Sequence, residues 1–140
     1  GYLKNEEETK KALKDGWLLT GDLGYIDDEG YLFIVDRKKS LIIRGGENIS
    51  TLEVENALDR HANILESCVC GIDDPKFGEI VGAYIYCNAD VSEEAIKAFL
   101  NESIAGYKVP EVFHISKDPL PRIATEKIDR VGIKKILSSQ

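Results

Sequence analysis

Lys127 is the residue whose type and position best suit it for chemistry. Pro119 and Pro121 disfavour helix at the residues before them, and Asp129 can cap a helix that follows. Lys127 is therefore expected on a loop, two residues before the helix cap. An ammonium group on such a loop can meet an anion that another surface brings to it. The alternative interpretation is an ordinary surface charge, since the chain has 18 basic residues.

The elements that must position this loop follow one another along residues 50–140. Ser50 and Glu53 match a capping box for a helix that runs to about Arg60. The pattern then predicts strands over 66–72 and 80–87, a helix capped by Ser92, a strand over 112–115 and a last helix. This order predicts an α+β fold, in which a small mixed sheet has helices packed on it.

The first third of the chain carries other strand and turn signals. A polar turn that ends in glycine, Asp27–Gly30, separates two β-branched and aromatic runs and predicts a β-hairpin. The charged residues 36–40 then interrupt the apolar pattern and mark the best candidate for a domain boundary. We therefore expect two units that meet within these residues. A short strand, Leu41–Ile43, and a glycine loop, Arg44–Asn48, should follow the boundary.

Composition limits the classes of function. The 140 residues are 43% hydrophobic and contain no apolar run of membrane-spanning length, which predicts a soluble globular protein without a membrane-spanning segment. A formal net charge of −7 disfavours nucleic acid as a partner. Three cysteines and two histidines support neither a disulfide framework nor a zinc site. We expect buried thiols in a reducing compartment such as the cytoplasm, and no metal site.

Five motifs follow one another along nearly the whole chain. They are Thr20-Gly21-Asp22, Asp36-Arg37-Lys38-Lys39, the loop Arg44 to Ile49 leading to Glu53-Val54-Glu55, Tyr107-Lys108-Val109-Pro110, and Leu120-Pro121-Arg122 ending at Lys127-Ile128-Asp129-Arg130. Each motif is weak alone, but their order is specific. In this order they resemble the motifs of the adenylate-forming enzymes: acyl-CoA synthetases, adenylation domains of peptide synthetases, and luciferases.

The resemblance implies a chain that works as part of a larger enzyme. In this superfamily a large N-terminal domain binds the carboxylic acid and ATP with Mg²⁺. A small C-terminal domain closes over the large domain. The family's phosphate loop and acyl pocket have no counterpart here, and the chain begins at Gly1 and lacks methionine. We therefore expect a fragment that is inactive alone: the last strip of the large domain over 1–38, then the small mobile domain over 39–140. The resemblance implies a hinge at Lys39.

Three residues receive roles in adenylation from the resemblance. Lys127 is implied as the cation that assists attack of the carboxylate on the α-phosphate of ATP. Asp22 is implied as the acceptor for the ribose hydroxyls, and Arg37 as a further contact to the nucleotide. By themselves, Asp22 could be an ordinary turn aspartate and Arg37 a solvated hinge charge.

The glycine loop is assigned to the second half-reaction. In the acyl-CoA synthetases the corresponding loop lines the tunnel for the pantetheine arm of CoA, which implies this role for Gly45, Gly46, Glu47 and Asn48. The loop could also be a plain strand-to-helix turn. The loop and the Tyr-Lys-Val-Pro motif look most like acyl-CoA synthetases that act on fatty or related acids, with CoA as co-substrate. A peptide-synthetase domain that loads a carrier protein is the alternative.

Two positions depart from the family pattern. Glycine usually stands immediately before the lysine of the last motif, whereas this chain has Glu126, which brings a carboxylate beside Lys127 and removes a residue that accepts positive φ. Thr51 stands where proline often follows the glycine loop. The Glu126 departure gives some support to a further alternative, a non-catalytic interaction module of the same fold.

Overall fold

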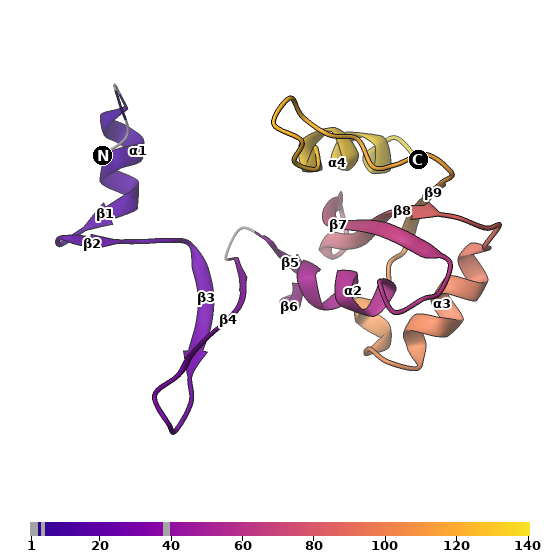
Figure 1. Ribbon diagram of the computed structural model, residues 1–140, viewed down its shortest axis with the longest axis horizontal. Coiled ribbons are helices and arrows are strands. Elements are labelled where there is room, and N and C mark those ends of the chain that lie inside the picture. The colour runs from indigo at the N-terminus through magenta and orange to yellow at the C-terminus, as the bar shows by residue number, and fades with distance from the viewer. Residues whose placement is uncertain (1–2, 4, 38–39) are drawn as a thin grey trace. The chain divides into compact units, whose positions relative to one another are not determined.

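The computed structural model describes residue 3 and the ranges 5–37 and 40–140. The chain divides into two compact units, Gly1–Lys39 and Ser40–Gln140. Among the described residues, no helix is long and apolar enough to cross a membrane. Figure 1 shows the element order from the N-terminus to the C-terminus.

The first unit is built from one short helix and two hairpins. Its elements are α1 (Glu6–Ala12), β1 (Leu13–Lys14), β2 (Trp17–Leu18), β3 (Asp22–Ile26) and β4 (Leu32–Arg37). The predicted hairpin is present as β3 and β4, and its turn is held by Asp27 Oδ1, which accepts hydrogen bonds from the amides of Glu29 and Tyr31. None of the unit's described residues is buried, and Tyr25 and Phe33 stack on each other in the open.

The second unit is built around one mixed sheet, as predicted (Figure 1). The strands are β5 (Leu41–Arg44), β6 (Glu47–Ser50), β7 (Ile64–Asp74), β8 (Gly78–Cys87) and β9 (Val112–Ser116). Their order is β6-β5-β8-β7, with β9 parallel to the later half of β8 and all other pairs antiparallel. The segment 47–50 was not predicted as a strand, since Glu47 and Asn48 were assigned to the glycine loop and Ser50 to the helix cap. It is a strand because it pairs along its whole length with β5.

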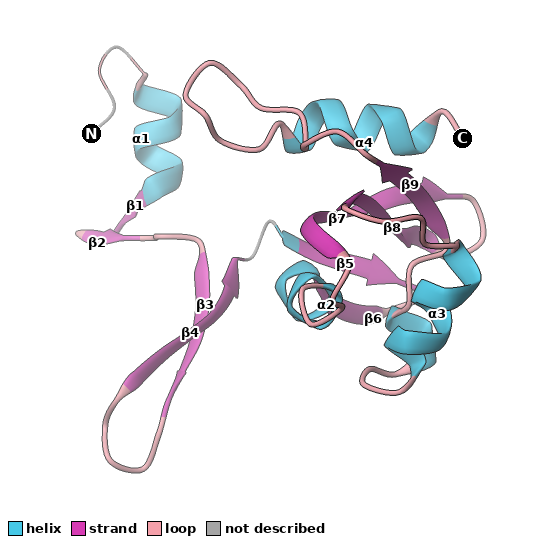
Figure 2. Cartoon of the chain, turned by 45° about the vertical axis from the view of Figure 1, so that its right-hand side comes forward, coloured by secondary structure: helices cyan, strands magenta, loops and turns pink. Residues whose placement is uncertain are grey.

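Three helices cover the two faces of this sheet, α2 (Thr51–Leu58), α3 (Glu93–Asn101) and α4 (Arg130–Ser138). Figure 2 shows α4 on one side of the strands and α2 with α3 on the other. Two apolar clusters match these layers: one includes Val54, Leu58 and Ile96 from α2 and α3, and the other includes Ile133 and Leu137 from α4. The predicted order of helix, strand, strand, helix, strand, helix after residue 50 is confirmed.

Each of the three helices begins at the residue that the sequence predicted. The side chains of Ser50, Ser92 and Asp129 accept hydrogen bonds from backbone amides three residues later, at 3.1, 3.2 and 2.9 Å. Such caps satisfy amides that have no partner within the helix. The cap at Asp129 fixes the start of α4 directly after the loop that carries Lys127.

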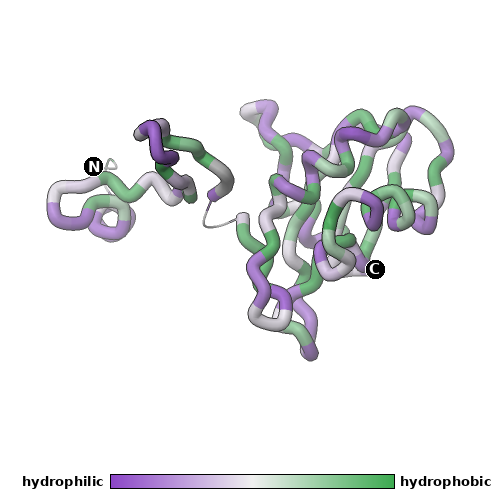
Figure 3. Tube along the Cα trace, turned by 90° about the horizontal axis from the view of Figure 1, so that it is seen from below, coloured by the Kyte–Doolittle hydropathy of each residue, from purple (hydrophilic) through white to green (hydrophobic). Residues whose placement is uncertain are grey.

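Side chains alternate between the two faces along the central strands, and each face carries an apolar cluster. Figure 3 shows where hydrophobic and hydrophilic residues lie along the chain. Cys68 points to the α4 side, and its neighbour Val69 points to the other core. The three cysteines are free thiols, of which Cys68 and Cys87 are buried. Burial raises the pKa of Cys68 to about 12 and that of Cys70 to about 11, so both remain protonated near neutral pH.

Candidate active site

Lys127 lies on a tight turn between the end of β9 and the start of α4. Arg122 and Ile128 form an isolated antiparallel bridge, and the Ile123 amide donates to the Lys127 carbonyl at 2.9 Å. The Glu126 amide closes the turn by donating to the Ile123 carbonyl at 2.9 Å. The Lys127 side chain is exposed and has no ion-pair or hydrogen-bond partner among the described residues. Its backbone is therefore held while its ammonium is available.

Glu126 adopts the left-handed backbone conformation, with φ of 63°. This is the position at which the sequence departs from the glycine usual in the family. A residue with a Cβ atom loses roughly 1–2 kcal/mol in this conformation. The turn therefore keeps a geometry that suits glycine, and the surrounding structure must supply the difference.

Side chains from β7 and from the loop itself hold the turn. Arg122 pairs through Nη2 with Glu66 of β7, and its Nη1 donates to the Glu126 carbonyl at 2.9 Å. The second carboxylate oxygen of Glu66 faces the Leu120 amide at 3.5 Å. Sequence reasoning missed Glu66, because the partner of Arg122 lies 56 residues away along the chain.

A second ion pair fixes the helix that follows Lys127. Arg130 Nη1 lies 2.9 Å from Glu55 Oε1, and Glu55 is only 9% exposed. The same carboxylate accepts from the Val69 amide at 2.9 Å, and Arg130 donates to the Val69 carbonyl at 3.1 Å. This arrangement joins two of the motifs recognised in the sequence, 53–55 and 127–130, through the middle of β7.

Lys108, from the Tyr-Lys-Val-Pro motif, differs from Lys127 in being engaged. Its Nζ lies 2.6 and 2.7 Å from the two carboxylate oxygens of Glu53 in α2. The hydrogen bond with Glu53 raises the pKa of Lys108. The geometry thus gives Lys108 a structural partner and leaves Lys127 as the cation of these two motifs that can receive a ligand.

The glycine pair forms the two-residue turn of the β5–β6 hairpin. Gly45 and Gly46 have φ of 57° and 93°, which are conformations that hairpin turns of this length require and that glycine accepts. The Gly45 amide donates to the Phe77 carbonyl at 2.8 Å, and the Arg44 guanidinium lies 4.2 Å from the centre of the Phe77 ring. The predicted loop is therefore shorter than expected, since Glu47 begins β6.

Of the four residues assigned to the CoA tunnel, the glycines form the turn, and Glu47 and Asn48 lie on β6 with exposed side chains. Glu47 pairs with Arg44, and Asn48 with Ile43, in the strand register. The four residues thus occupy one end of a single hairpin. The interpretation as a strand-to-helix turn is wrong, because a complete strand separates the turn from α2.

The turn of Lys127 and the turn of Gly45 are attached at opposite ends of β7. Glu66, which holds Arg122, lies near the start of this strand, and Phe77, which holds Gly45, follows its end. Glu66 and Asp74 are eight residues apart, which corresponds to about 26 Å along an extended strand. The second unit therefore presents two separate candidate surfaces.

In the first unit, Asp22 and Arg37 come together as cross-strand partners of β3 and β4. Arg37 Nε donates to Asp22 Oδ1 at 3.1 Å. Asp22 is the first residue of β3 and not a turn residue, and its amide donates to Thr20 Oγ1 at 3.2 Å. The two residues assigned to the nucleotide are thus direct neighbours. Lys39, the predicted hinge, lies outside the described residues.

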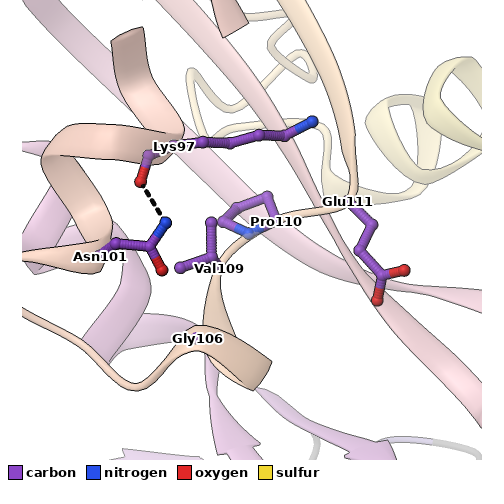
Figure 4. Close-up of a pocket in the computed structure, with 6 residues that line it drawn as sticks. All are labelled: Lys97, Asn101, Gly106, Val109, Pro110 and Glu111. Atoms are coloured by element: carbon purple, nitrogen blue, oxygen red, sulfur yellow. Dashed lines mark hydrogen bonds between the residues drawn. The ribbon is translucent and has the colours of Figure 1, made fainter. Parts of the chain in front are cut away.

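A further open pocket of the second unit has no counterpart among the predicted sites. Figure 4 shows Lys97 and Asn101 of α3 on one side, with the segment from Gly106 to Glu111 on the other. The Asn101 amide already donates to the Lys97 carbonyl, and Glu111 is paired with Arg44 at 2.9 Å. Within the described part of the chain, no cluster of histidine, cysteine, aspartate and glutamate could hold a metal ion.

Comparison with known proteins identifies the family. Residues 53–127, more than half of the chain, match the AMP-binding enzyme C-terminal domain family. The chain belongs to this family. The match ends at Lys127 and includes both partners of the pairs Glu53–Lys108 and Glu66–Arg122.

Relatives of this AMP-binding C-terminal domain include acyl-CoA ligases. It is 48% identical over 130 residues to the 2-succinylbenzoate–CoA ligase of Bacillus licheniformis, covering 93% of the chain and 27% of that protein. A solved structure of o-succinylbenzoate CoA synthetase from Bacillus subtilis, in complex with its acyl-adenylate intermediate, is 42% identical with a TM-score of 0.81, covering 89% of this chain and 26% of that one.

ATP-bound MatB from Rhodopseudomonas palustris is 33% identical, with a TM-score of 0.86, and the match covers 99% of this chain and 28% of that one. The chain thus spans little more than a quarter of the length of these relatives. The expectation of a fatty acid substrate and of a role in fatty acid metabolism is not supported, because the two Bacillus relatives named above are ligases of succinylbenzoate.

Proposed function

We propose that this chain is the C-terminal part of an AMP-forming acid–CoA ligase, in which residues 39–140 form a mobile small domain and residues 1–38 the end of the large domain. The observation that best supports this proposal concerns Lys127. Its backbone is fixed by the turn, yet its ammonium has no partner among the described residues. A lysine held in this way is preorganised for an anion that arrives from elsewhere. None of the first unit's described residues is buried, which agrees with a strip that packs on a larger domain.

In the proposed adenylation step, a carboxylate oxygen of the acid attacks the α-phosphorus of ATP, and the bond to pyrophosphate breaks. Two anions must approach each other, and Lys127 lies between them in the closed arrangement. A pair of unit charges 4 Å apart is worth about 4 kcal/mol at an effective dielectric constant near 20. Asp22 would accept from the ribose hydroxyls, with Arg37 beside it. Mg²⁺ would come with ATP and be held by the rest of the enzyme.

In the proposed second step, the thiolate of CoA attacks the carbonyl carbon of the acyl-adenylate, and AMP leaves. The Gly45–Gly46 turn would line the path of the pantetheine arm, with Glu47 and Asn48 next to it. The two turns are attached at opposite ends of β7. A rotation of the small domain about the proposed hinge at Lys39 would therefore exchange one surface for the other at the same active site.

We further propose 2-succinylbenzoate as the acid, because ligases for this compound are 48% and 44% identical to the chain. A peptide-synthetase type of domain would use a carrier protein in place of free CoA, and no relative named above is of that type. The residues that select the acid are expected in the rest of the enzyme.

The test uses the complete ligase that contains this chain. Lys127→Ala should lower acid-dependent ATP–pyrophosphate exchange by about 10²- to 10³-fold, the usual effect of removing one such donor. Lys135→Ala, at an exposed lysine of α4, is the control and should leave exchange unchanged. If Lys127→Ala has no effect, the chain is a non-catalytic module. The same assay should give a higher kcat/KM with 2-succinylbenzoate than with a long-chain fatty acid, and the reverse order would contradict the substrate proposal.

A further inference from the structure

Glu126, directly before Lys127, has a backbone conformation that is unfavourable for residues other than glycine. Glu126 has φ of 63°, and the residues of the turn that flank it, Thr125 and Lys127, are not glycine either. A left-handed residue with a side chain persists where surrounding contacts impose it. The question is which contact imposes it here.

Arg122 makes a contact that can impose the left-handed conformation on Glu126. One end of its guanidinium donates to the Glu126 carbonyl at 2.9 Å, and the other pairs with Glu66 on β7. The planar guanidinium can serve two acceptors in fixed directions, which a lysine ammonium does less rigidly. The carbonyl that it holds belongs to the peptide bond joining Glu126 to Lys127. The orientation of this peptide bond determines where the Lys127 side chain leaves the turn.

Glu66 fixes the Arg122 side chain to the sheet. It lies on β7, which pairs with β8 along nearly its whole length, and its side chain is 30% exposed. Its carboxylate therefore fixes the guanidinium to the sheet and not merely to the loop. A hydrogen bond between an ionised arginine and a carboxylate is stronger than a neutral hydrogen bond.

We propose that Arg122, held by Glu66, is a positioning residue. It imposes the left-handed conformation at Glu126 and thereby orients the Lys127 side chain. This rests on the proposed role of Lys127 and deepens it. Arg122 itself touches neither substrate nor reacting atoms in this account. Its substitution should therefore impair the step that uses Lys127 and spare the step that uses the Gly45–Gly46 turn.

The first experiment examines the turn itself, in the 140-residue chain, by amide hydrogen exchange. The amides of Ile123 and Glu126 are both hydrogen-bonded within the turn. In Arg122→Ala their exchange should quicken about tenfold, the scale expected for losing a hydrogen bond to a charged group, while the amides of α3 stay unchanged. Lys117→Ala, which removes an exposed ion pair with Asp90, is the control. Exchange in Arg122→Ala equal to that in the control would overturn the proposal.

The second experiment uses the complete ligase and separates the two half-reactions. Arg122→Ala should lower the kcat of pyrophosphate exchange by about 10- to 100-fold, as expected for a displaced catalytic group, with the KM for ATP unchanged. Thioester formation from supplied acyl-adenylate should be unaffected, and Arg122→Lys should recover part of the loss. Equal loss in both half-reactions would show a merely structural role and overturn the proposal.

Lys127→Ala in the same assays separates this inference from the proposed function. If Lys127→Ala abolishes exchange but Arg122→Ala does not lower it, the positioning role is wrong and the proposed function stands. If Lys127→Ala leaves exchange unchanged, the proposed function is wrong, and the positioning role fails with it, whatever the amide exchange shows.

Discussion

The two turns that carry the candidate chemistry of the second unit obtain the same kind of backbone in different ways. The β5–β6 turn has two residues with positive φ, and both are glycine. The turn before Lys127 has one, and it is Glu126. In the β5–β6 turn, positive φ is possible because the residues are glycine. In the turn before Lys127, it is imposed by Arg122 and Glu66, which lie outside the turn.

This difference predicts where each turn is sensitive to substitution. A glycine turn should be damaged only by changes at the glycines themselves, because no other side chain is needed to form it. The Lys127 turn should be damaged by changes at positions that are not in the turn. An imposed conformation also makes the Lys127 turn responsive to changes at Glu66 on β7.

The largest expected effect is that substitutions in the two turns impair different half-reactions. A change in the β5–β6 turn should impair thioester formation, and a change at Lys127 should impair adenylation. Gly45→Asn keeps the hairpin, because asparagine is favoured at the first position of this turn and the added Cβ would be in ordinary contact with Phe77 at 3.5 Å. In the complete ligase it should lower thioester formation by about 10- to 100-fold by obstructing the pantetheine arm, and leave pyrophosphate exchange intact. Lys127→Ala should do the opposite.

If Gly45→Asn slowed both half-reactions equally, the two turns would not serve separate steps. Far-UV circular dichroism of the variant should match that of the parent chain. This check excludes misfolding as the cause of either loss.

A smaller effect is expected on stability at the second glycine. Gly46→Val places a β-branched residue at φ of 93° and should lower the free energy of unfolding by about 2 kcal/mol, whereas Gly46→Asn should cost less. Urea titration followed by far-UV circular dichroism measures this. Fluorescence is unsuitable, because Trp17 belongs to the first unit. Equal costs for valine and asparagine would show that φ is not what selects glycine here.

The smallest effect is expected at Glu126. Glu126→Gly removes a left-handed penalty of roughly 1–2 kcal/mol but adds chain entropy to the unfolded state worth about 0.5–1 kcal/mol, so the net change should be a gain of about 1 kcal/mol or less. Urea titration of the 140-residue chain measures it. In the Glu126→Gly background, Arg122→Ala should quicken amide exchange of the turn less than in the parent. A stability loss above about 1 kcal/mol would mean that the Glu126 side chain makes a contribution of its own.

Features with local causes were predictable from the sequence. The starts of α2, α3 and α4 were correct because a cap and its helix lie within three residues of each other. The β3–β4 hairpin was correct for a similar reason, since its turn is held by Asp27 two and four residues away. Strand β6 was missed because Glu-Asn-Ile-Ser has only one apolar residue, and it is extended only because β5 pairs with it.

The candidate site divides in the same way. Residue types and their order determined which family the chain resembles, where the loop and the glycine turn fall, and that Lys127 precedes a capped helix. Only the tertiary structure decided which charges are paired: Glu53 with Lys108, Glu55 with Arg130, and Glu66 with Arg122. These partners are 55 or more residues apart, so strand pairing and helix packing bring them together, and no local pattern reports it. Among the described residues, Lys108, Arg122 and Arg130 are each paired with a carboxylate, whereas the Lys127 ammonium is not.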